Sequence, residues 1–193
     1  ILLLISALYG FLIRWNFSFP IENFSYKNVL QSHSHVAFLG WGYLSVLVLI
    51  IRFFIKSYLW QSKVYLYTFL TMLICIVLML FSFPLGGYKL FSIVLLSVFG
   101  VTSYIISFKL LKDLEGDTYS VKLIKFSIYY YLLSSLATWF LAGVLVTQGK
   151  TELYYNTVYF YLHFLYNGFF VFALFGLFFK LLEAQKAPIV EQH

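Results

Sequence analysis

Histidine side chains within apolar stretches are the groups in this sequence best suited to chemistry. His33 and His35 open the run QSHSHVAFLGWGY, and His163 lies in YLHFLYNGFF, far along the chain. An ionisable side chain is costly in hydrocarbon, so a histidine in a membrane-spanning helix is a candidate for function, with a partner elsewhere. Neutral imidazole ligates haem iron and is also a ligand for copper and non-haem iron. We therefore expect a haem or metal site if His35 and His163 share one layer of the fold.

Composition defines the environment of these histidines. Of the 193 residues, 62% are hydrophobic and only 10% are charged, and the mean hydropathy is +0.89. Soluble domains carry about a quarter charged residues. The sequence therefore predicts an integral membrane protein whose main partner is the lipid bilayer. The net charge of +6 does not indicate nucleic-acid binding, because the lysines and arginines lie between apolar spans and form no continuous basic face.

The apolar segments predict an all-α, polytopic transmembrane helical bundle of about six spanning helices. A bilayer core of about 30 Å needs about 20 mostly apolar residues per helix, and the period-two alternation of a membrane barrel is missing. We expect residues 1–182 to form the bundle and residues 183–193 to form a cytoplasmic tail or linker. A turn is expected at residues 84–87, which read PLGG. The six segments are Ile1–Trp15, Asn28–Ile51, Val64–Phe83, Lys89–Lys109, Phe126–Thr147 and Tyr155–Lys180.

The positive charges predict the orientation. With six spans, nine of the thirteen lysines and arginines fall on one side, and four (Arg14, Lys27, Lys89 and Lys150) fall on the other. The positive-inside rule makes the first side cytoplasmic, so both ends of the chain are expected in the cytoplasm. Aromatic residues near span ends are expected to be interface anchors. These are Trp15, Tyr43, Trp60, Tyr88 and Tyr155.

This orientation places two histidines at similar depth. His35 lies eight residues after Lys27, and His163 lies eight residues after Tyr155, so each is expected roughly 12 Å from the outer boundary. His33 lies two residues earlier, rotated by about 200° on an α-helix, and must point away from the side that His35 faces.

The last span predicts a polar face around His163. Helical spacing places Tyr159, Tyr166, Asn167 and Phe170 on the same broad side as His163. We expect this face to point into a cavity or the bundle interior, because lipid offers no hydrogen-bond partner. The preceding span carries a second polar face. Its members are Ser134, Ser135 and Thr138, and these residue types also serve close helix packing.

Other chemistries find little support in the residues. Zinc hydrolysis usually takes three protein ligands, and neither HExxH nor a cysteine cluster is present. The single cysteine, Cys75, lies in an apolar run and is expected to be a packing residue. All seven acidic residues fall in loops or the tail, so a carboxylate proton path is not expected.

The segment from His35 to Trp41, HVAFLGW, resembles the second helix of the catalytic subunit of haem–copper oxidases, including the nitric oxide reductase branch. The resemblance implies that His35 ligates a low-spin haem, with His33 and Trp41 beside it. It also implies that His163 lies at a copper or non-haem iron site, with Tyr159, Tyr166 and Asn167 around it. The chain would then be the N-terminal half of an approximately twelve-helix bundle.

The same resemblance implies a haem–copper-type oxidoreductase in respiratory electron transfer, placed in a bacterial inner membrane with other respiratory subunits. Two alternatives stay open. One is a non-catalytic accessory or assembly subunit, whose histidines hydrogen-bond across helices or to lipid. The other is a transporter or channel, with the polar faces of the last two spans lining a path.

Overall fold

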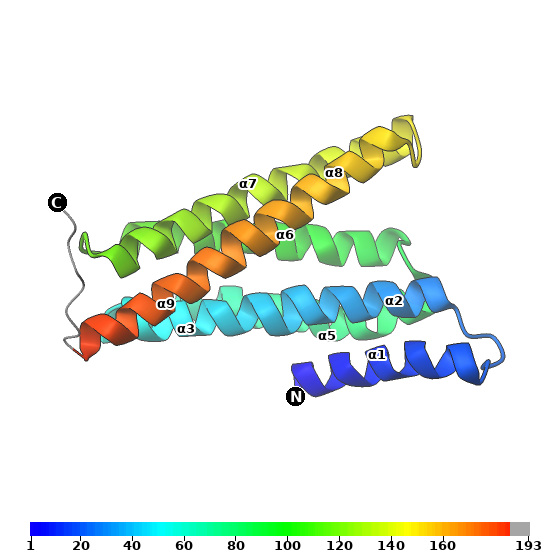
Figure 1. The fold of residues 1–193 in the computed structure, drawn as a ribbon, viewed down its shortest axis with the longest axis horizontal. Helices are drawn as coiled ribbons and strands as arrows, with labels where there is room; N and C mark the ends of the chain where they lie inside the picture. Colours follow the sequence, from blue (N-terminus) through cyan, green and yellow to red (C-terminus); the bar gives the residue numbers. More distant parts are fainter. Residues whose placement is uncertain (186–193) are drawn as a thin grey trace. The chain divides into compact units, whose positions relative to one another are not determined.

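The expected all-helical membrane fold is confirmed. The computed structural model describes residues 1–185, apart from the side chains of residues 145 and 146, and its regular elements in this range are all helices (Figure 1). Five helices are long and apolar enough to cross a membrane, and Leu2–Ser18 is a shorter apolar helix. The five are Tyr26–Phe54, Lys63–Gly86, Leu90–Asp113, Tyr119–Val144 and Glu152–Ala184.

Two of the five long helices are composite, because a π-helical segment interrupts each of them. The first consists of α2, η1 and α3, and the last consists of α8, η2 and α9. The predicted boundary at residue 182 falls two residues before the end of α9, and residues 186–193 of the predicted tail lie outside the described residues. The elements are α1 (Leu2–Ser18), α2 (Tyr26–His35), η1 (Val36–Tyr43), α3 (Leu44–Phe54), α4 (Ser57–Trp60), α5 (Lys63–Gly86), α6 (Leu90–Asp113), α7 (Tyr119–Thr147), α8 (Glu152–His163), η2 (Phe164–Phe170) and α9 (Val171–Ala184).

The chain divides into two compact units, and the first contains His33 and His35. Unit 1 consists of Ile1–Leu47 and Trp60–Ile106. Within it, α2 packs against α1 and α5, and η1 also contacts both (Figure 1). The core of this unit is apolar and closely packed, as the fully buried Val36, Met72 and Ile76 show. Cys75 is also buried, as expected of a packing cysteine.

The end of α5 differs from the predicted turn, because the helix continues through Pro84 to Gly86. Proline lacks an N–H group, so the carbonyl of Leu80, four residues earlier, receives no bond from it. The hydroxyl of Tyr9 in α1 donates to this carbonyl at 2.8 Å. The helix stops at Gly87, which has a φ of 62°, a conformation that favours glycine. The contact from α1 thus compensates for the proline.

Unit 2 consists of Val48–Leu59 and the chain from Ser107 onward. Here α7 packs along α8, η2 and α9 as an antiparallel hairpin (Figure 1). Two glycines permit close approach. A Cβ on Gly168 would lie 2.6 Å from the Cβ of Tyr130, and one on Gly176 would lie 2.6 Å from Cδ1 of Ile124. The hairpin therefore depends on small residues at its interface, as membrane helix pairs often do.

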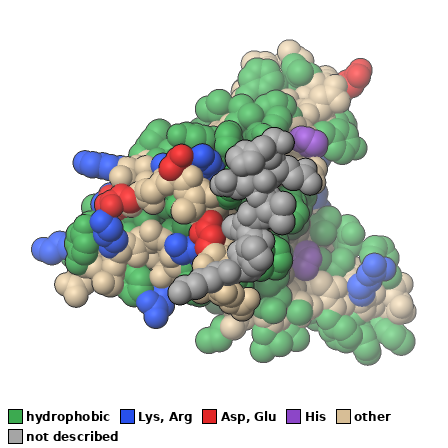
Figure 2. All heavy atoms as spheres, turned by 60° about the vertical axis from the view of Figure 1, so that its left-hand side comes forward, with side chains coloured by type: hydrophobic (Ala, Val, Ile, Leu, Met, Phe, Trp, Pro, Cys, Tyr) green, Lys and Arg blue, Asp and Glu red, His purple; other side chains and the backbone are tan. Residues whose placement is uncertain are grey.

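Charged side chains gather at one end of unit 2, as Figure 2 shows. Lys56 pairs with Glu115 at 2.6 Å, and Lys122 pairs with Asp117 at 3.0 Å. The hydrogen bond and the charge of Glu115 raise the pKa of Lys56. Such exposed pairs contribute little stability. Their position outside the apolar spans agrees with a membrane boundary at this end.

Candidate functional site

Each of the two candidate ligand histidines is the last α-helical residue before a π-helical segment. His35 precedes η1, which has the sequence VAFLGWGY, and His163 precedes η2, which has the sequence FLYNGFF. Single π-helical turns within α-helices are rare. Where they do occur, they frequently lie at functional sites. The sequence predicts an unbroken α-helix at both places, so these π-helical segments were not predicted.

His35 is held in a defined orientation by its own helix and by the end of α5. Its Nδ1 lies 2.7 Å from the carbonyl oxygen of Gln31, so Nδ1 carries the proton and donates it. Nε2 is then the acceptor, and the hydroxyl of Tyr88 lies 3.4 Å from it. The ring stacks on Phe83, with centroids 4.5 Å apart and planes at 15°. The structure thus fixes both the tautomer and the plane of the imidazole.

His33 faces the opposite side of α2, as its position two residues before His35 predicts. Its Nδ1 donates to the carbonyl oxygen of Ser6 in α1 at 2.9 Å. The ring also lies against Gly10, where an added Cβ would be 3.2 Å from the imidazole Cε1. His33 therefore connects α2 to α1, because the absence of a side chain at Gly10 leaves room for its ring. This is a structural role.

His163 has a looser environment. Its side chain is exposed, and its Nδ1 lies 3.3 Å from the amide nitrogen of Asn167. An amide nitrogen can only donate, so Nδ1 is the acceptor and Nε2 carries the proton. The ring of Phe164 approaches edge-on at 5.2 Å. The predicted His163–Asn167 neighbourhood is therefore present in unit 2.

The other predicted site residues are more exposed than an interior face would be. Tyr159 is 67% exposed and Trp41 is 47% exposed, whereas Tyr166 is half-buried and stacks on Phe170. Of the expected interface anchors, Tyr43 is instead buried at 2% exposure. It packs edge-on against Phe99 within unit 1.

The polar face of α7 is explained by packing. Ser134 donates to the carbonyl of Tyr131, Ser135 to that of Leu132, and Thr138 to that of Ser135. Hydroxyl groups that bond to their own helix backbone satisfy themselves locally and do not require a polar path. This arrangement favours close packing over a transport pathway in unit 2.

A polar cluster beside His35 was not identified from the sequence. Asn28 donates its amide to the carbonyl of Pro84 at 3.4 Å, and Gln31 has a buried side-chain oxygen without a hydrogen-bond partner in the described structure. Gly87 allows both side chains to approach the α5–α6 turn. A polar run, QSHSH, was visible in the sequence, but its partners on α5 lie about fifty residues away. A buried acceptor is expected to have a partner, from water or from a ligand.

No group of three or more histidine, cysteine, aspartate or glutamate side chains that would hold a metal occurs among the described residues. His35 belongs to unit 1 and His163 belongs to unit 2. Their predicted use at one common site stays a prediction. The arrangement in unit 1 supplies one well-oriented imidazole, an aromatic wall and a buried acceptor.

Comparison of the chain with models of known families, with curated proteins and with solved structures gives no match.

Proposed function

We propose that this protein binds haem through His35 and acts in respiratory electron transfer, as a membrane protein similar to the catalytic subunit of haem–copper oxidases. The observation that carries the proposal is the 2.7 Å hydrogen bond from Nδ1 of His35 to the carbonyl oxygen of Gln31. It leaves the lone pair of the imidazole on Nε2. Metal-ligating histidines usually have this arrangement, in which the other ring nitrogen donates to a carbonyl or carboxylate.

The surroundings of His35 fit a haem ligand in two further respects. The stacked ring of Phe83 fixes the imidazole plane and gives an apolar wall, as a porphyrin pocket needs. The buried oxygen of Gln31, one turn before His35, is an acceptor without a protein donor in the described residues. A protonated propionate or an ordered water would satisfy it.

A bound haem would supply one-electron transfer. The residues of the chain would orient and shield it: the carbonyl of Gln31 would hold the imidazole, and Phe83 would limit water. The Tyr88 hydroxyl, which lies 3.4 Å from Nε2, would give up that contact when Nε2 binds iron. His163, with Asn167 and Tyr166 nearby, remains our candidate ligand for a second metal, copper or non-haem iron. In this proposal the protein resides in a bacterial inner membrane with both ends of the chain in the cytoplasm.

Optical spectroscopy with metal analysis of the intact purified protein tests the proposal. We expect a low-spin haem spectrum and haem iron in a fixed ratio to protein. His35→Ala should abolish the low-spin signal, whereas His33→Ala, the matched control two residues away on the opposite face, should retain it. A colourless, iron-free wild-type protein, or equal loss in both variants, would contradict haem ligation by His35.

The accessory-subunit alternative is supported by one contact, the bond from His33 to the backbone of Ser6. It shows that a histidine in this segment serves helix–helix packing. This alternative predicts that the protein co-purifies with a larger membrane complex. It also predicts that His35→Ala assembles normally and that the isolated protein contains no haem.

A further inference from the structure

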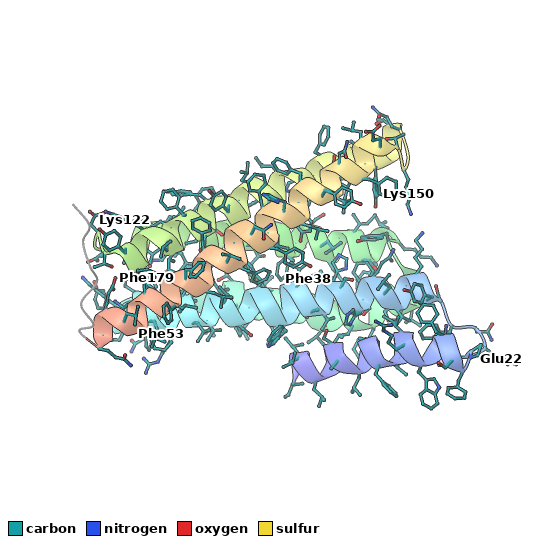
Figure 3. The ribbon with its side chains drawn as sticks, viewed as in Figure 1. Glu22, Phe38, Phe53, Lys122, Lys150 and Phe179 are labelled. Carbon is teal, nitrogen blue, oxygen red and sulfur yellow. The ribbon has the colours of Figure 1, made fainter. Side chains whose placement is uncertain are left out.

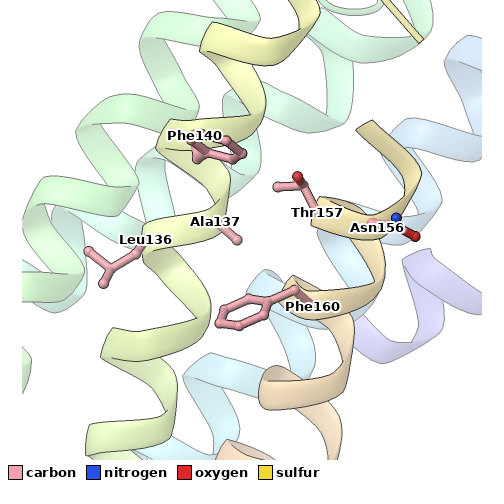
Figure 4. Close-up of a pocket in the computed structure, with 6 residues that line it drawn as sticks. All are labelled: Leu136, Ala137, Phe140, Asn156, Thr157 and Phe160. Carbon is pink, nitrogen blue, oxygen red and sulfur yellow. The ribbon is translucent and has the colours of Figure 1, made fainter. Parts of the chain in front are cut away.

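An apolar groove lies on unit 2 between α7 and α8, and its lining residue Phe160 lies one helical turn before His163. It has a volume of about 370 Å³, and its lining is almost entirely apolar. Figure 4 shows Ala137 and Phe140 of α7 facing Thr157 and Phe160 of α8 across it. The hydroxyl of Thr157 donates to the carbonyl of Leu153 at 2.7 Å, so its proton already has an acceptor in the helix backbone. The groove therefore suits a hydrocarbon chain.

The depth of the groove matches the start of a lipid acyl chain. α7 ends at Thr147 and α8 begins at Glu152, so Phe140 and Thr157 lie about 8–10 Å along their helices from the connecting turn. The headgroup layer on each side of a bilayer is about 5–8 Å thick. Because the apolar spans end at Val144 and begin again at Glu152, the turn between them fits headgroup depth, and the groove lies within the apolar spans.

The turn carries two opposite charges. Lys150 and Glu152 are both exposed, and neither forms a salt bridge within the described part of the chain. Figure 3 places Lys150 at this turn, at the opposite end of α7 from Lys122. In addition, Thr151 precedes α8 without a side-chain hydrogen bond to its first turn. The first N–H groups of α8 are therefore open to an anion.

We propose that the α7–α8 hairpin binds a phospholipid with a primary ammonium headgroup, that is, a phosphatidylethanolamine. The phosphate would contact Lys150 and the N-terminal N–H groups of α8, the ammonium would contact Glu152, and one acyl chain would occupy the groove. A purely anionic headgroup would meet repulsion from Glu152. A quaternary ammonium headgroup lacks the N–H donors that a carboxylate bonds best.

The experiment is lipid retention by the intact purified protein. The protein is reconstituted in nanodiscs of equal parts phosphatidylethanolamine, phosphatidylglycerol and phosphatidylcholine, extracted in mild detergent, and analysed by native mass spectrometry. Two exposed charge contacts give about a fivefold enrichment of phosphatidylethanolamine over the other two lipids. Both Lys150→Ala and Glu152→Gln should remove most of it. Lys89→Ala, at the α5–α6 turn, is the matched control and should retain it.

A groove-filling variant, Ala137→Leu, separates the acyl chain from the headgroup. It should lower retention of all three lipids at this site, and circular dichroism with thermal unfolding verifies that the variant is folded. Equal retention of the three lipids by wild type would overturn the proposal. Enrichment of phosphatidylglycerol that depends on Lys150 and not on Glu152 would also overturn it, in favour of an anionic ligand.

Discussion

His35 and His163 occupy the same local position in two helices and differ in nearly everything around them. Each is the last α-helical residue before a π-helical segment that contains glycine. His35 has its Nδ1 bonded to backbone, its ring stacked on Phe83 and its Nε2 near Tyr88. His163 is exposed, and the side chain of Asn167 lies at hydrogen-bond distance from its ring.

The difference comes from the neighbouring helices. In unit 1 the extended end of α5, with Phe83 and the turn at Gly87, folds over the side of α2 that carries His35. In unit 2 the hairpin partner α7 lies against Gly168 and leaves His163 on an outer face. The two histidines therefore share a backbone feature, whereas the neighbouring helices hold only the ring of His35 in a defined orientation within the described structure.

The largest effect should come from the glycines of the two π segments. An added Cβ at Gly168 meets the Cβ and Cγ of Tyr130 at 2.6 and 2.8 Å, which lie at the root of that side chain and cannot move without the backbone. An added Cβ at Gly40 has one contact this short, at 2.8 Å to Cγ2 of the fully buried Ile76. Gly168→Ala should therefore lower the free energy of unfolding by about 1–3 kcal/mol, and Gly40→Ala should lower it by a smaller amount, about 1 kcal/mol.

Unfolding of the two variants by SDS in mixed micelles measures this difference. Gly143→Ala is a suitable control, because an added Cβ at Gly143 meets nothing within 4 Å and alanine favours the helix. An equal loss of stability at Gly40 and Gly168 would show that the π segments, not their neighbours, are sensitive to substitution.

The second effect concerns the histidines themselves. His35→Ala removes the stacking on Phe83 and a partly buried hydrogen bond, so it should cost about 1–2 kcal/mol of unfolding free energy, apart from any bound cofactor. His163→Ala should cost less than about 0.5 kcal/mol, as is usual for an exposed side chain. His35→Phe retains the stacking and should fall between them. A larger cost at His163 than at His35 in the same unfolding assay would reverse the comparison.

The sequence predicts the spans well, because a long apolar segment in a bilayer must form a helix to satisfy its backbone hydrogen bonds. The segments expected at Asn28–Ile51 and Val64–Phe83 correspond to helices at Tyr26–Phe54 and Lys63–Gly86. The sequence predicts a turn from Pro84, whereas α5 continues to Gly86. The carbonyl that Pro84 leaves without a donor is bonded by Tyr9, about seventy residues away. Local propensity at a proline contains no information about such a partner.

The candidate site was predictable only in part. The opposite directions of His33 and His35 follow from helix geometry alone and are confirmed. The roles of Phe83 and Tyr88 were not predictable, since both depend on where α5 ends. The polar face around His163 was expected in an interior, yet Tyr159 is 67% exposed. Helical periodicity groups residues on a face, but it does not tell which neighbour covers that face.

The smallest and most specific effect is on the imidazole tautomers. Nitrogen-15 spectra of histidine-labelled protein in lipid should show the Nδ1–H form at His35 and the Nε2–H form at His163. Asn167→Ala removes the donor that faces Nδ1 of His163 and should give a mixture of tautomers there. Gln31→Ala should leave His35 unchanged, because its acceptor is the backbone carbonyl and not the side chain. If Gln31→Ala altered the tautomer of His35, the ring would be held by side chains, and its fixed orientation as a ligand would lose its basis.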